Sequence, residues 1–216
     1  MATKKITGVP ELDAMIAQLN KKFEKEIITE EPYKPQGAIP TGSAALDAAL
    51  GVGGLAKGIV AEVLGEPSSG KTSFALQVLK NAQAQREPDS DIRDILIDIE
   101  HTSTEEFIQG FGVNTSKLIH VRPETAEQAL QIARDLPKTG KVGVVIIDSV
   151  GALETSKKQQ KDVGEIEPGG IAKLMHDTCR SISKTASETG TTFLFINHIT
   201  YKIGVMYGKM ISYLSL

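Results

Sequence analysis

The stretch from Gly65 to Thr72 constrains this chain more than any other part of its sequence. It reads GEPSSGKT and fits G-x-x-x-x-G-K-[ST], the phosphate-binding loop of nucleotide hydrolases. An apolar run at 59–64 precedes it, and residues 73–79 follow with apolar side chains at helical spacing. The motif needs this strand–loop–helix context, because the loop N–H groups and the helix N-terminus then face the same phosphates. The stretch therefore predicts a nucleoside triphosphate site.

Each part of the loop has an expected role. Its two glycines let the backbone turn N–H groups toward phosphate oxygens. Lys71 is expected to reach the β- and γ-phosphates, and Thr72 to place its hydroxyl on Mg²⁺. The predicted nucleotide-binding residues here are Gly65, Glu66, Pro67, Ser68, Ser69, Gly70, Lys71, Thr72 and Ser73.

The composition mainly excludes certain kinds of site and partner. With 216 residues, 40% apolar and 24% charged, the chain is long enough for one globular α/β domain with a short appendage. A net charge of −3 gives no overall attraction to nucleic acid, so such binding would need local basic loops. Cys179 is the only cysteine, which excludes a disulfide framework and a four-cysteine zinc site. We interpret it as a helix-packing residue, the alternative being a reactive thiol. No apolar run approaches a membrane span and the N-terminus lacks a signal-peptide pattern, so we expect no membrane contact and a cytoplasmic location, the host cytoplasm if the chain is viral.

Strand and helix patterns alternate along most of the chain. Near-continuous apolar runs indicate strands buried on both faces, as in a parallel sheet. We expect an α/β fold with a doubly wound, mostly parallel sheet and an N-terminal helix appendage, divided into residues 1–36 and 37–216. The expected strands are 59–64, 95–100, 118–121, 142–149 and 191–196, and the expected helices are 73–86, 104–111, 124–136 and 171–188.

The N-terminal region carries two further patterns. Residues 10–28 have apolar side chains at three- and four-residue spacing, which predicts an amphipathic helix followed by a linker at 30–37. That helix is free to dock on its own domain or on a neighbouring subunit. Residues 41–50 predict a capped short helix that runs into a glycine-rich turn.

Two acidic residues end expected strands and are candidates for the chemistry. Asp148 is a candidate partner for Mg²⁺, the alternative being a plain strand cap. Glu100 could activate the water that attacks the γ-phosphate, and we expect its strand to lie beside the phosphate-loop strand. A solvated strand-end charge is the alternative, and Asp98 is the weaker candidate.

Polar residues also end the last expected strand. Asn197 and His198 would lie at the carboxyl edge of the sheet, where His198 could sense the γ-phosphate or simply cap the strand. The other three histidines, His101, His120 and His176, show no metal-ligand spacing.

Two segments have a composition that suits single-stranded nucleic acid. Residues 157–161 are locally basic, with Lys157, Lys158 and Lys161. Residues 200–208 combine Lys202 with two tyrosines and aliphatic side chains. Phosphate neutralisation plus stacking is the chemistry of single-strand binding, although a lysine run is more often a solvated surface.

From about residue 10 to residue 208 the chain resembles the RecA recombinase family. Residues 41–64 are similar to the segment before its phosphate loop, Gly65–Thr72 to its Walker A motif, and 97–101 to the strand bearing its catalytic glutamate. Residues 146–150 resemble its Walker B motif, and 195–198 and 202–208 resemble a core strand and the start of its second DNA loop.

The resemblance implies an ATP-dependent recombinase that polymerises on single-stranded DNA, pairs it with double-stranded DNA and exchanges strands. It makes Glu100 the water-activating base, Lys71 and Thr72 the phosphate and Mg²⁺ ligands, and Asp148 the Walker B acid. It places Phe107 where the family has an adenine-stacking tyrosine. It also implies that Arg180 and Gly204 lie near the DNA loops and that the helix at 10–28 docks on the adjacent protomer.

The sequence departs from the family pattern at several positions. His198 replaces a γ-phosphate-sensing glutamine, Thr104 an acidic adenine contact and Thr200 a basic loop residue. Residues 209–216 do not continue the family's sequence, and we expect them to arise from a frame change or read-through, which would make the chain an N-terminal fragment with an incomplete core.

Two other functions remain open from the sequence. One is a helicase-like or circadian-clock-type ATPase on the same core. The other is a non-hydrolysing module that caps or modulates filaments of a full-length homologue.

Overall fold

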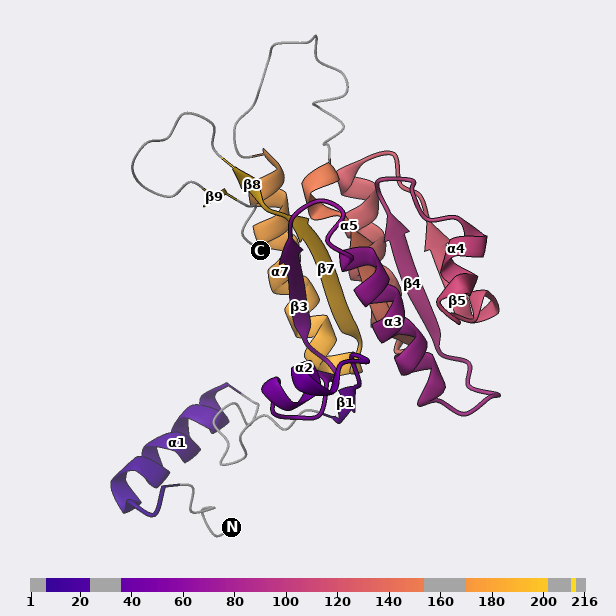
Figure 1. Ribbon diagram of the computed structural model, residues 1–216. Helices are drawn as coiled ribbons and strands as arrows, with labels where there is room; N and C mark the ends of the chain where they lie inside the picture. The colour runs from indigo at the N-terminus through magenta and orange to yellow at the C-terminus, as the bar shows by residue number, and fades with distance from the viewer. Residues whose placement is uncertain (1–6, 24–35, 154–169, 202–210, 213–216) are drawn as a thin grey trace. The chain divides into compact units, whose positions relative to one another are not determined.

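The computed structural model describes residues 7–23, 36–153, 170–201 and 211–212, and the chain forms two compact units, residues 1–35 and 36–216 (Figure 1). In the first unit, α1 spans Pro10–Lys22, within the helix expected over 10–28. Proline at its first position, acids in the first turn and lysines in the last suit the geometry and dipole of a helix. Asp13 Oδ1 accepts hydrogen bonds from Thr7 N at 2.8 Å and Thr7 Oγ1 at 2.9 Å, which fixes the approach to the helix.

A five-stranded sheet forms the centre of the second unit. Its strands lie in the order β3-β7-β6-β4-β5, and every neighbouring pair is parallel. The α/β fold with a parallel sheet is therefore confirmed. Their bounds are β3 Val60–Gly65, β4 Arg93–Asp98, β5 Leu118–Val121, β6 Val142–Asp148 and β7 Thr192–His198.

One expectation about the sheet is wrong. The strand that precedes Glu100, β4, does not lie beside the phosphate-loop strand β3, because β7 and β6 lie between them. Local sequence patterns indicate that a strand exists, whereas strand order depends on how the crossover helices pack. Because the strands are parallel, their carboxyl ends nevertheless share one edge of the sheet.

Helices cover both faces of the sheet (Figure 1). The side chains of the strands alternate between two hydrophobic cores. Ile95, Ile97, Val145 and Ile147 pack with residues of α5 (Ala126–Asp135) and α7 (Gly170–Thr189). Leu96, Val144, Ile146 and Leu194 pack with residues of α3 (Lys71–Ala84) and α4 (Glu105–Gly110). Burial on both faces explains why the strand sequences are apolar runs rather than alternating patterns.

Short elements complete the described part of the chain. The antiparallel pair β1 (Ala38–Ile39) and β2 (Leu55–Ala56) was not expected from the sequence. It requires glycine at position 54, where a Cβ would lie 2.2 Å from Ile39 O. Ser43 caps α2 (Ala44–Ala49) as expected, its Oγ accepting from Leu46 N. The remaining elements are η1 Thr115–Lys117, η2 Leu136–Thr139, η3 Val150–Ala152, β8 Thr200–Tyr201 and β9 Ile211–Ser212.

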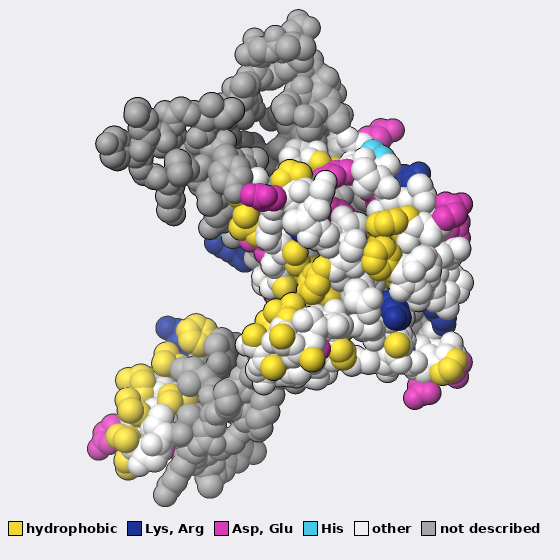
Figure 2. Space-filling model, in the orientation of Figure 1, with side chains coloured by type: hydrophobic (Ala, Val, Ile, Leu, Met, Phe, Trp, Pro, Cys, Tyr) yellow, Lys and Arg dark blue, Asp and Glu magenta, His cyan; other side chains and the backbone are white. Residues whose placement is uncertain are grey.

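Among the helices of the described ranges, none combines the length and apolar character that a membrane crossing needs. The strand arrows in Figure 1 point upward, so the carboxyl ends of the strands lie at the top of the sheet. Figure 2, in the same orientation, shows acidic side chains and a histidine exposed at that end.

Candidate functional site

The loop between β3 and α3 has the backbone geometry that its glycines predict. A Cβ on Gly65 would lie 2.8 Å from Ser69 Oγ, so the first glycine allows the loop to fold tightly on itself. Gly70 has φ +87° at the N-cap of α3, a left-handed conformation that favours glycine. Ser68 is also left-handed at φ +59°. The loop thus curls over the N-terminus of α3, where a helix favours an anion.

Lys71 is folded back over this loop. Its Nζ donates to Gly65 O at 3.2 Å and to Glu66 O at 2.7 Å, and the residue is only 7% exposed. Two neutral carbonyls are modest partners for a buried ammonium group, whereas phosphate oxygens form shorter and stronger charge-assisted bonds. The residue therefore fits a phosphate group in the loop.

Thr72 and Asp148 join α3 to the end of β6. Thr72 Oγ1 donates to Asp148 Oδ2 at 2.6 Å. Burial raises the pKa of Asp148, the Thr72 hydrogen bond opposes that shift, and the charges of Glu100 and Asp98 raise it further. The Thr72 hydroxyl and the Asp148 carboxylate lie in a partly buried, acidic environment. Both are oxygen ligands of the kind that Mg²⁺ prefers, so these residues fit a divalent cation.

Glu100 follows β4 and meets residues from two other strand ends. Ser149 Oγ donates to its Oε1 at 2.5 Å, and His198 Nε2 lies 2.9 Å from the same oxygen. Burial pushes the pKa of Glu100 upward, but hydrogen bonds from Ser149 and His198 and the charges of His198 and Lys71 hold it below its usual value. The carboxylate is therefore ionised at neutral pH and can accept a proton.

These groups line one cavity of about 290 Å³. The structure thus brings together the loop, the candidate base Glu100, the candidate metal ligand Asp148 and the candidate sensor His198, although the strand order differs from the expected one. The lining residues are Ser68, Gly70, Lys71, Thr72, Ser73, Glu100, Asp148 and His198.

Other candidate residues are not at this cavity or lie outside the described residues. Phe107, on α4, is 42% exposed, packs edge-on against Phe111 with ring centres 5.2 Å apart, and does not line the cavity. Arg180 is exposed on α7. The candidates outside the described residues are Lys157, Lys158, Lys161, Lys202 and Gly204.

Sequence reasoning missed the contact of Ser149 with Glu100 and the backbone contacts of Asp98. Ser149 holds Glu100, and its position directly after Asp148 was the available signal. Asp98, judged a weak candidate for the base, instead accepts backbone N–H groups from Thr102 at 3.2 Å and Ser103 at 3.0 Å. Cys179 is half-buried; burial and the charge of Glu62 raise the pKa of its thiol, which fits the packing role expected for it.

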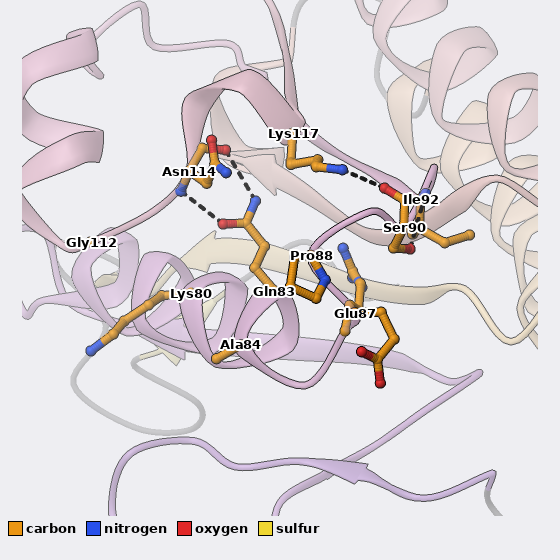
Figure 3. A pocket seen from close by; sticks show the side chains of 11 residues that line it. Lys80, Gln83, Ala84, Glu87, Pro88, Ser90, Ile92, Gly112, Asn114 and Lys117 are labelled. Carbon is orange, nitrogen blue, oxygen red and sulfur yellow. Dashed lines mark hydrogen bonds between the residues drawn. The ribbon is translucent and has the colours of Figure 1, made fainter.

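A second cavity of about 300 Å³ lies near the C-terminal end of α3, away from the phosphate loop (Figure 3). Its polar groups bond to one another. Asn114 N donates to Gln83 Oε1 at 2.8 Å, Gln83 Nε2 donates to Asn114 O at 3.3 Å, and Lys117 donates to Ser90 O. These contacts join α3 to η1 and to the segment before β4.

The parallel sheet, the loop geometry and the Lys71–Thr72–Asp148 arrangement define an α/β protein of the phosphate-loop class. A family model described as the RecA N-terminal domain matches residues 10–212. The chain belongs to this family.

Several bacterial proteins are similar to it over most of its length. Each alignment covers 201 residues, which is 92% of this chain and 56% of the relative. The chain therefore spans a little over half the length of these curated relatives. They are Protein RecA of Salinispora tropica and of an Arthrobacter strain, each 42% identical, and Protein RecA of Nocardia farcinica, 40% identical.

Proposed function

We propose that this chain is the ATPase core of a DNA recombinase, which hydrolyses ATP with Mg²⁺ and uses that cycle on DNA. The observation that carries the proposal is the shared cavity, where Lys71, the Thr72–Asp148 pair and Glu100 face one another. The loop and Lys71 hold the phosphates, and Thr72 and Asp148 hold the metal ion, which neutralises charge on the β- and γ-phosphates when it is bound.

Glu100 is the group that we assign to the chemistry. It accepts a proton from the water whose oxygen attacks the γ-phosphorus, and the bond from that phosphorus to the β–γ bridging oxygen breaks to release ADP and phosphate. Ser149 and His198 hold one carboxylate oxygen, which fixes the orientation of the base. We assign to His198 the role of sensing the γ-phosphate, which its contact with Glu100 supports.

The partners are proposed from family membership. We propose that the protein binds single-stranded DNA, assembles with copies of itself into a filament and promotes pairing and exchange with double-stranded DNA in the cytoplasm. The DNA contacts are assigned to Lys157, Lys158, Lys161, Arg180, Lys202 and Gly204, Phe107 to the adenine, and α1 to the adjacent protomer.

ATP turnover, measured with and without single-stranded DNA, tests this function. We expect DNA to stimulate turnover of the natural chain and Glu100→Ala to lower it by about 10²–10³-fold while ATP still binds. Glu188→Gln, an exposed acid at 58% on α7, is the matched control and should keep full turnover.

Two other outcomes would change the proposal, one in its function and one in its catalytic residue. Tight ATP binding without turnover in the natural chain would identify a non-hydrolysing module. Turnover that is insensitive to Glu100→Ala would remove the assignment of the base.

A further inference from the structure

The chain makes a sharp corner directly after β4, and Glu100 lies in it. Ile99 N donates to Asp148 O at 2.7 Å, so pairing with β6 continues one residue beyond the strand. The chain then leaves the sheet at Glu100 and His101. His101 has φ +54°, a conformation that few residues other than glycine adopt.

The carboxylate of Asp98 closes the other side of this corner. Asp98 is fully buried, its Oδ1 accepts from Thr102 N at 3.2 Å, and its Oδ2 accepts from Ser103 N at 3.0 Å. Backbone N–H groups bond more strongly to a carboxylate than to a neutral acceptor. The corner is therefore fixed at both ends, by Asp148 O before Glu100 and by Asp98 after it.

Residues that end β5 hold Asp98 from the far side. His120 Nε2 lies 3.4 Å and Arg122 Nε 3.9 Å from Asp98 Oδ2. Arg122 Nη2 also donates to Ser103 O at 2.9 Å. The guanidinium group thus contacts both the buried carboxylate and the segment that the carboxylate binds, and it ties β5 to the corner.

The geometry points to Asp98 as the positioning residue for Glu100. Arg122 supports it, and we call Asp98 and Arg122 together the clamp. The inference rests on the proposed role of Glu100 as the base. Asp98 is not among the residues that line the cavity, so it acts through the backbone of the corner. A looser corner moves the base relative to the attacking water but leaves Lys71 and Thr72 in place. Loss of the contacts that Asp98 makes should therefore lower kcat and leave ATP affinity unchanged.

The first test compares two substitutions on the same strand. Asp98→Asn keeps the side-chain size but turns an amide NH₂ group toward a backbone donor. We expect kcat to fall by about 10- to 10²-fold, the Kd for ATP to stay within about twofold, and hydrogen exchange of residues 99–104 to accelerate. Asp94→Asn is the control, because Asp94 is equally buried at the other end of β4. Asp94→Asn should lower the free energy of unfolding, because Asp94 pairs with Arg86, but it should leave kcat unchanged and should not speed exchange at 99–104 more than in the rest of the core.

A milder substitution serves if Asp98→Asn does not fold. This substitution is Arg122→Gln, at a side chain that is 50% exposed. Its control is Arg134→Gln on α5, where the side chain is 41% exposed and pairs with Asp135. We expect Arg122→Gln alone to lower kcat and to speed exchange at 99–104.

The two readouts separate this inference from the proposed function. If the natural chain shows no ATP turnover, the proposed function fails, and faster exchange at 99–104 in the two variants still supports the clamp. If the chain hydrolyses ATP but Asp98→Asn and Arg122→Gln match their controls in kcat and exchange, the positioning role is overturned.

Discussion

The two ends of β4 carry buried carboxylates in contrasting surroundings. Asp94, at the amino end, accepts Arg86 Nη1 at 2.8 Å, Arg86 Nη2 at 2.7 Å and Val144 N at 2.9 Å. Asp98, at the carboxyl end, accepts hydrogen bonds from two backbone N–H groups, and the His120 ring and the Arg122 guanidinium group lie farther away. Close by, the Ser103 hydroxyl is buried without a hydrogen-bond partner among the described residues.

This contrast separates a stabilising contact at one end of β4 from the proposed chemistry at the other end. At the amino end a bidentate pair fills the available space so closely that a Cβ on Gly143 would lie 2.0 Å from Arg86 Nη2. At the carboxyl end the polar groups surround a cavity and leave room for a ligand. Substitutions at the amino end should therefore cost stability, and those at the carboxyl end should cost turnover.

The largest expected effect is at the phosphate loop. Lys71→Ala removes the ammonium group that we assign to the phosphates, so turnover should fall by about 10²–10³-fold or ATP binding should be lost. A coupled phosphate-release assay and nucleotide titration measure both. Lys80→Ala, on the same helix but at the second cavity, is the control and should keep its turnover. Equal activity in the two variants would refute the site.

At the amino end of β4, a substitution should lower stability rather than turnover. Arg86→Ala leaves the carboxylate of Asp94, 0% exposed, without its charged partner, and should lower the free energy of unfolding by about 3–5 kcal/mol. Arg134→Ala, which breaks an exposed pair, should cost much less. Urea unfolding measures both. If Arg86→Ala stayed as stable as Arg134→Ala, the amino end would not have the stabilising role that we assign to it.

The smallest effect concerns the pKa of Glu100. Ser149→Ala removes a hydrogen bond that lowers this pKa, so the carboxyl should titrate nearer to, or above, its ordinary value of 4.5. A lowered pKa in the folded state means that the bond contributes stability above the unfolded value and loses it as pH falls through the folded one. The cost of Ser149→Ala should thus be present at pH 7 and disappear in strong acid.

Carbon NMR of the carboxyl group follows this titration directly. A midpoint that does not move upward in Ser149→Ala would show that the 2.5 Å contact does not govern the ionisation of Glu100.

Local motifs predicted the parts of the site that are contiguous in sequence. The loop, Asp148 and the strand and helix positions could be predicted because glycine spacing and apolar runs act over a few residues. The order of the strands could not, since β3 and β4 are kept apart by two strands that come later in the chain. For the same reason the contacts from Ser149 and His198 to Glu100 were missed.

Asp98 shows a second limit. A buried acid at a strand end has the same sequence signature whether it binds a ligand or its own backbone. Its partners Thr102 and Ser103 carry no sequence pattern that distinguishes an acid that binds a ligand from one that binds its own backbone. Only the fold of the corner reveals that the carboxylate holds the segment around Glu100.

The central claim is that ATP lies between the phosphate loop and Glu100 at the carboxyl edge of the sheet. A crystal structure with Mg²⁺ and a non-hydrolysable ATP analogue tests it most directly. We expect the γ-phosphate within hydrogen-bond distance of Lys71 Nζ, with Thr72 Oγ1 on the metal and Glu100 facing the γ-phosphorus. A nucleotide bound elsewhere, for instance in the cavity between Lys80 and Lys117, would contradict the account.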